Sequence, residues 1–90
     1  MIKINTTVLN ESGIHARPAG MLVKEACKFK STIDIQVNSK RMDAKSIMGV
    51  MALGISKGSE VILYIDGPDE EAAKEALISL FEDGFGELNQ

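Results

Sequence analysis

Residues 32–44 read TIDIQVNSKRMDA, and this stretch decides the class of fold. Apolar and polar residues alternate from residue 32 to residue 37, which is typical of a strand with one buried face. Asn38 and Ser39 fit a two-residue hairpin turn, and residues 40–44 then form the returning strand. A hairpin joins antiparallel strands, so the stretch indicates an antiparallel sheet.

The flanking sequence predicts further strands and helices around this hairpin. Residues 2–8 alternate in the same way, whereas the helix that follows them has apolar residues at spacings of three and four. Ser46 before a short apolar run and Gly54 after it are helix start and stop signals. Asp69 is expected to cap the last helix with its side chain. The predicted elements cover, in order, residues 2–8, 16–28, 32–37, 40–44, 47–53, 60–66 and 70–83.

The predicted order of elements is β-α-β-β-α-β-α. Three of the four predicted strands have a polar side, so the sheet is expected to have one covered and one open face. Helices on one side of an antiparallel sheet make an α+β domain. We therefore expect a two-layer open-faced sandwich, with four antiparallel strands and three helices on one face, in a single domain over residues 1–90. The periodicity leaves the order of the strands in the sheet open.

The composition argues against several classes of protein. A chain of 90 residues has little room for a deep pocket, which disfavours a metabolic enzyme with an enclosed site. The single cysteine, Cys27, allows no intramolecular disulfide, so we expect a reducing, cytoplasmic setting and a core-facing position for this side chain. The sequence has no long apolar run that indicates a signal peptide or membrane insertion. One His and one Cys are too few for a closed zinc site, and we expect no metal and no cofactor.

The charges are distributed unevenly along the chain. Residues 1–57 contain nine Lys and Arg against four Asp and Glu, a net charge of +5, whereas residues 58–90 contain one against nine, a net charge of −8. The first part is therefore expected to dock on an acidic partner, which the last part would repel. Because the chain has few aromatic residues and no nucleic-acid-binding motif, we expect no direct binding of nucleic acid.

His15, the only histidine, lies where a loop meets the start of the first predicted helix. The first turn of a helix carries unpaired main-chain N–H groups, here beginning at Ala16, and these attract phosphate. Arg17 adds a planar set of donors, and Pro18 stiffens the first turn. The pattern predicts a phosphate site at which a neutral imidazole attacks phosphorus. The plainer alternative, an ordinary N-cap or surface histidine, leaves the adjacent arginine unexplained.

Two stretches of the chain resemble a known family. Residues 13–19, GIHARPA, closely resemble the active-site signature of HPr, the histidine-containing phosphocarrier family of the phosphoenolpyruvate:sugar phosphotransferase system. Residues 45–54, KSIMGVMALG, resemble the regulatory serine region of the same family. The two stretches have the family's spacing, and the predicted element order matches that of the whole HPr domain.

The resemblance implies a stoichiometric carrier rather than a catalyst. His15 is expected to accept phosphate on Nδ1 from phosphorylated enzyme I, which takes it from phosphoenolpyruvate, and to pass it to the IIA domains of sugar permeases. Arg17 is expected to stabilise the charge of the phosphoryl group. Ser46 is expected to be phosphorylated by HPr serine kinase, and the product to pair with a catabolite repressor. Two alternatives remain: a regulatory module that acts through Ser46, and a carrier of the parallel nitrogen-linked system.

A surface for partner proteins is predicted on the two helices that follow His15 and Ser46. The apolar residues of the run 47–53 are too many for one face of a short helix, so some are expected to be exposed. Met21 shares a helical stripe with basic residues of the first helix. The predicted docking residues are Met21, Lys24, Lys28, Ile47, Met48 and Met51, with Arg17 beside them. Residues 85–90 are assigned no role.

Overall fold

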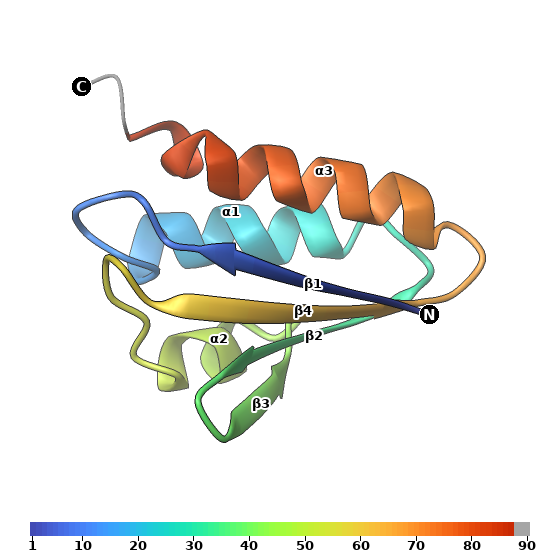
Figure 1. The fold of residues 1–90 in the computed structure, drawn as a ribbon, viewed down its shortest axis with the longest axis horizontal. Coiled ribbons are helices and arrows are strands. Elements are labelled where there is room, and N and C mark those ends of the chain that lie inside the picture. Colours follow the sequence, from blue (N-terminus) through green and yellow to red (C-terminus); the bar gives the residue numbers. More distant parts are fainter. Residues whose placement is uncertain (88–90) are drawn as a thin grey trace.

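Four antiparallel strands form one layer of the protein, and three helices pack on one face of that layer (Figure 1). The computed structural model describes residues 1–87. The expected two-layer α+β fold is confirmed, and the element boundaries differ from the predicted ones by at most two residues. The elements are, in chain order, β1 (Ile2–Thr7), α1 (Ala16–Ala26), β2 (Thr32–Val37), β3 (Lys40–Asp43), α2 (Ile47–Ala52), β4 (Glu60–Asp66), α3 (Glu70–Glu82) and a short 3-10 turn, η1 (Gly84–Gly86).

The strand order in the sheet is β1-β4-β2-β3, so the last strand of the chain lies between β1 and β2. Ile4 of β1 and Ile35 of β2 both pair with Leu63 of β4, one from each side. β2 and β3 form the predicted hairpin, which Asn38 turns with a positive φ of 56°. All adjacent strands in this sheet pair antiparallel, as the hairpin indicated.

The alternating pattern of the strands places their apolar side against the helices. Val61, Leu63 and Ile65 of β4 are fully buried, and Leu22 of α1 and Phe81 of α3 cover them from the helical layer. Burial of a side chain of this size contributes about 1.5–3 kcal/mol to folding. The helices therefore hold their positions through the core, and their outer faces and N-terminal ends are left for function.

Cys27 does not face the core, and the prediction that it does is wrong. The helix ends at Ala26, and Cys27 is the C-cap residue, with an exposed side chain. The buried stripe of α1 includes Leu22 and Ala26, and Cys27 lies one residue beyond this stripe. Its Sγ lies 3.9 Å from the main-chain oxygen of Lys45, at the edge of the contact between α1 and α2.

Asp69 occupies the N-cap position of α3, but its side chain does not cap the helix as predicted. Its carboxylate instead accepts hydrogen bonds from the main-chain N–H groups of Lys30 (2.8 Å) and Ser31 (2.9 Å) and from the Ser31 hydroxyl. These contacts, with the Ser31 hydroxyl as the largest contributor, lower the pKa of Asp69 to about 2. Asp69 therefore joins the start of α3 to the loop between α1 and β2.

Asp69→Asn is expected to lower the melting temperature by roughly 5 °C at neutral pH, because the amide replaces a charged acceptor. A carboxylate whose pKa falls on folding stabilises the folded state above its unfolded pKa, near 3.8, and loses that contribution as the pH falls toward 2. Thermal melts should show a constant difference in melting temperature between the two proteins above about pH 5. This difference should disappear between about pH 4 and pH 2. Glu71→Gln, which removes an exposed carboxylate from the same helical turn, is the matched control. A gap of unchanged size from pH 7 to pH 2 would contradict the assignment.

Candidate functional site

His15 is the N-cap residue of α1, and its side chain is exposed. The ring makes no capping hydrogen bond, while the main-chain oxygen of His15 accepts the first bond of the helix from the N–H of Ala19 (2.7 Å). The amides of Ala16 and Arg17 precede that first bond, and Pro18 has no N–H. His15 is thus an exposed residue at the N-cap position whose ring does not itself cap the helix, an arrangement that fits both the predicted phosphate acceptor and the plainer reading as a helix N-cap or surface histidine.

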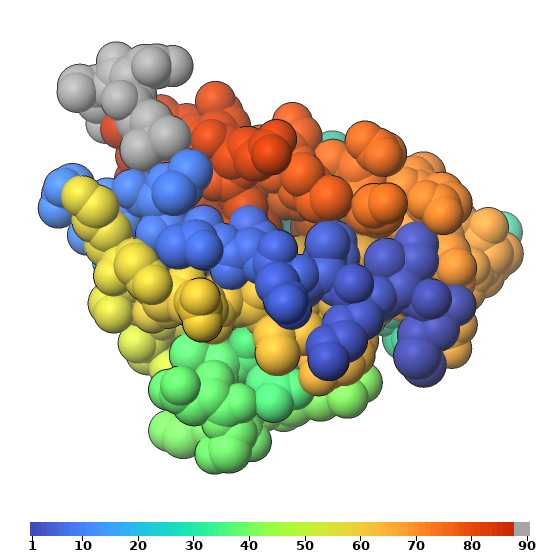
Figure 2. Space-filling model, in the orientation of Figure 1, coloured from blue at the N-terminus to red at the C-terminus, as the bar shows by residue number. Residues whose placement is uncertain are grey.

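The loop before His15 is held by the loop before β4. Val8 N–H donates to the oxygen of Ser59 (3.0 Å), and Ile14 N–H donates to the oxygen of Ile55 (3.0 Å). Figure 2 shows the two loops, light blue and yellow, side by side at one end of the molecule. Gly13 has a φ of +67°, and a Cβ atom there would lie 2.4 Å from the oxygen of Ile55. Glycine is therefore required where the chain turns into the site.

Arg17 lies on the first turn of α1 with its side chain 58% exposed. Its Nη1 lies 3.5 Å from Oε2 of Glu87, a residue that comes just after η1. The other carboxylate oxygen of Glu87, Oε1, accepts hydrogen bonds from Asn10 Nδ2 (2.8 Å) and from the Ser12 hydroxyl. The guanidinium next to His15 is therefore already paired with a carboxylate that the predicted site did not include.

The pKa of Glu87 is held below its usual range by these neighbours. The hydrogen bond from Ser12 has the largest effect, the bond from Asn10 follows, and the charges of Arg17 and His15 add to them. Glu87 is therefore a carboxylate at neutral pH.

The tail after α3 places Glu87 at the site. Phe85 is fully buried, and its ring meets the ring of Phe81 edge-on, with 5.0 Å between centroids. This anchor folds the chain back, so that Glu87 reaches Asn10 and Ser12 in the loop after β1. The sequence carries no signal for this contact, since the tail has no periodicity and lies more than 70 residues from the loop. Of the tail to which no role was assigned, residues 88–90 lie outside the described part of the chain.

Ser46 lies at the start of α2 and is exposed. Its Oγ accepts a hydrogen bond from the N–H of Gly49 (3.2 Å), so the serine is the N-cap that the sequence indicated. The preceding Lys45 donates from Nζ to the main-chain oxygen of Phe29 (2.8 Å). This bond ties the residue before Ser46 to the loop that follows α1, and α2 also packs against α1.

The apolar residues of the predicted docking surface are largely exposed on α2. Ile47, Met48 and Met51 have exposed fractions of 40%, 80% and 45%. Met21 is only partly exposed, because it also packs against the core. Lys24 on α1 and Lys28 just after it are exposed, and Nζ of Lys28 lies 3.4 Å from Oε1 of Glu25. The predicted apolar residues are therefore exposed on α2, and the predicted basic residues are exposed on and just after α1, which packs against α2.

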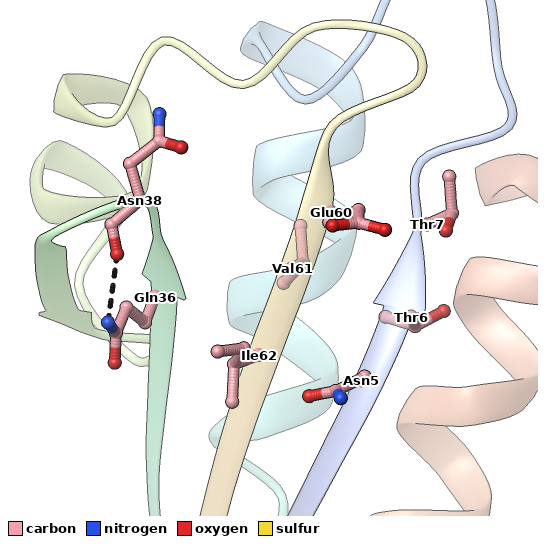
Figure 3. A pocket seen from close by; sticks show the side chains of 8 residues that line it. All are labelled: Asn5, Thr6, Thr7, Gln36, Asn38, Glu60, Val61 and Ile62. Carbon is pink, nitrogen blue, oxygen red and sulfur yellow. Dashed lines mark hydrogen bonds between the residues drawn. The ribbon is translucent and has the colours of Figure 1, made fainter.

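A shallow hollow of about 330 Å³ lies away from these residues, near one end of β1, β4 and β2 (Figure 3). It is lined by Asn5, Thr6, Thr7, Gln36, Asn38, Glu60, Val61 and Ile62. These residues include none of the predicted site residues. Within residues 1–87, no three His, Cys, Asp or Glu side chains are grouped so that they could hold a metal ion. None of the described helices is long and apolar enough to cross a membrane.

Comparison with known proteins assigns the family. A family model described as the PTS HPr component phosphorylation site matches residues 2–83. The chain is 45% identical to the phosphocarrier protein HPr of Cupriavidus necator, over 97% of this chain and 98% of that protein. It is 46% identical to the phosphocarrier protein HPr of Treponema pallidum, over 97% and 99%. HPr-C-His from Thermoanaerobacter tengcongensis has a crystal structure with a TM-score of 0.94 and 46% identity, over 97% of this chain and 98% of that one. The chain therefore belongs to the HPr family, the phosphocarrier proteins of the phosphotransferase system.

Proposed function

We propose that this protein accepts a phosphoryl group on His15 from phosphorylated enzyme I and donates it to the IIA domains of sugar permeases. The observation that carries the proposal is an exposed imidazole at the start of α1, beside the Ala16 and Arg17 amides. In the forward step, a ring nitrogen of His15 attacks phosphorus, the bond from phosphorus to enzyme I breaks, and the proton on the other ring nitrogen is released. In the second step, an acceptor group of the IIA domain attacks the same phosphorus, and the imidazole leaves as a neutral ring after taking up a proton.

Arg17 would stabilise the phosphoryl group while it is bound to His15 and in transit. A guanidinium offers paired donors that match phosphate oxygens, and a charge-assisted hydrogen bond of this kind is about twice as strong as a neutral one. Ala16 would contribute its main-chain N–H, and Pro18 would hold the first turn of the helix in place. The whole chain, residues 1–90, would act as one HPr-like domain in the cytoplasm, without a metal or cofactor.

The proposed transfer can be tested directly. The protein is incubated with enzyme I and phosphoenolpyruvate labelled in its phosphate, the two proteins are separated, and the label bound to this chain is measured. A phosphoramidate on histidine is stable in alkali and labile in acid, so acid treatment should release the label and alkali should not. Absence of label on this chain, or a label that acid leaves in place, would contradict the proposed function.

Ser46 is the proposed regulatory site, with HPr serine kinase as the modifying enzyme and a catabolite repressor as a partner of the modified form. Ser46 is exposed at the N-terminus of α2, where a phosphate is tolerated by the helix. Phosphorylation adds about 1.5–2 negative charges at pH 7. These charges would lie next to Ile47 and Met48 on the proposed docking surface, so the effect is expected on docking rather than on the fold.

Protein that carries phosphoserine at residue 46 is expected to accept phosphate from enzyme I about tenfold more slowly, because the added charge repels an acidic partner. Single-turnover transfer from phosphorylated enzyme I measures the effect, and thermal melts check that the fold is kept. Phosphoserine at residue 79, an exposed position on α3, adds the same charge away from the proposed surface and is the matched control. Equal rates for the unmodified and the Ser46-modified protein would refute the regulatory role.

A further inference from the structure

The two carboxylate oxygens of Glu87 have different partners. Oε1 accepts hydrogen bonds from Asn10 Nδ2 and the Ser12 hydroxyl, whereas Oε2 faces Nη1 of Arg17 at 3.5 Å. The contacts that hold the carboxylate in place therefore do not depend on Arg17. The carboxylate would keep its place if the guanidinium moved away.

The support behind Glu87 is more rigid than its partner. Asn10 is fully buried and also donates from Nδ2 to the main-chain oxygen of Gly13 (2.8 Å), while Phe85 anchors η1 in the core. The side chain of Glu87 is 19% exposed, whereas that of Arg17 is 58% exposed. Of the two members of the ion pair, the arginine is the one that has freedom to move.

We propose that Glu87 is a positioning residue that competes with a phosphoryl group on His15 for the guanidinium of Arg17. The inference rests on the proposed function, because it assigns a role to Glu87 in transfer through His15. Arg17 cannot make its best contacts with both anions, since the carboxylate and the phosphoryl oxygens seek the same N–H donors. The fixed negative charge of Glu87 also repels a phosphoryl dianion within its reach.

The consequence concerns how readily the phosphate leaves. A carrier that held its phosphoryl group tightly would accept it well and donate it poorly, since stabilising the bound state raises the barrier to release. By competing for Arg17, Glu87 weakens the contacts between the guanidinium and the phosphoryl group. The free energy of the phosphorylated protein therefore stays high enough for it to donate the phosphoryl group to a IIA domain. Loss of the carboxylate should therefore favour the phosphorylated form and slow its discharge to a IIA domain.

The substitution Glu87→Gln tests this inference, because the amide oxygen still accepts from Asn10 and Ser12 while the charge is lost. We expect the equilibrium between enzyme I and this protein to shift about threefold to tenfold toward the phosphorylated protein. Inorganic phosphate, titrated against the unphosphorylated protein and followed through the NMR signal of Arg17 Nε–H, should bind more tightly by a similar factor. Glu82→Gln, which removes an exposed carboxylate from the end of α3, should change neither quantity.

Repeating both measurements in an Arg17→Ala background shows whether Glu87 acts through the guanidinium of Arg17. If Glu87 acts through the guanidinium, Glu87→Gln should have no effect once Arg17 is absent. An equal effect in both backgrounds, or no effect in the parent background, would overturn the inference. Failure of the unmodified protein to accept phosphate on His15 would instead overturn the proposed function, while the inorganic phosphate titration would still decide whether Glu87 competes for Arg17.

Discussion

His15→Ala is expected to reduce acceptance of phosphate from enzyme I by about 10³-fold or more, to the level of the background. The substitution removes the only imidazole of the chain. Labelled phosphoenolpyruvate with enzyme I measures the effect, with acid and alkali treatment to identify the bond.

The fold is expected to survive this change. The ring of His15 is exposed and does not cap α1, so the melting temperature should stay within about 3 °C of that of the unchanged protein. The docking surface also remains, and the variant should compete with the unchanged protein for enzyme I. Retention of acid-labile label by folded His15→Ala would show that another residue carries the phosphate.

The double substitution Met48→Asp and Met51→Asp is expected to weaken binding to phosphorylated enzyme I by roughly a hundredfold. Both side chains are exposed on α2, as is Ile47, and α2 packs against α1, which carries exposed basic residues. Two carboxylates would have to be dehydrated in the contact, and they would also repel an acidic partner. The concentration dependence of phosphate transfer measures the loss, which should appear as a higher KM with a smaller change in kcat.

Ala72→Asp with Ser79→Asp is the matched control for that experiment. It adds the same charge to exposed positions of α3, outside the proposed docking surface, and should leave KM within about threefold of the unchanged value. Because Met48 and Met51 are exposed, both double variants should keep the fold. An unaltered KM for the folded Met48→Asp, Met51→Asp variant would show that α2 does not contribute to docking on enzyme I.

Local patterns in the sequence were sufficient for most of the fold. The alternation in β2 predicted that strand with its observed boundaries, because a strand with one buried face must repeat every second residue. Residues 60–66 were also predicted as a strand, and β4 has those boundaries. Ser46 and Gly54 marked the ends of a short helix because capping is a local hydrogen-bonding requirement. The resemblance of residues 13–19 and 45–54 to the HPr family supplied the candidate site, which periodicity alone does not identify.

The position of β4 between β1 and β2 was decided by the tertiary structure. Alternation shows which side of a strand is buried, but every strand with an apolar side can pair with every other one, so the neighbour is left open. The side chain of Asp69 is a related case. The carboxylate of an Asp at a helix start usually accepts hydrogen bonds from the first N–H groups of the helix. The carboxylate of Asp69 instead accepts from the N–H groups of Lys30 and Ser31, because folding brings their loop within reach.

The sequence by itself determined the elements, the accessible histidine at the start of a helix, and the serine at the start of another. These depend on residues within a few positions of one another, whose interactions are the same in any fold that forms the element. Only the tertiary structure brought Glu87 to Arg17 and placed β4 between β1 and β2. Such contacts join parts of the chain far apart in sequence, and they exist only after the core has fixed the helices and the tail in space.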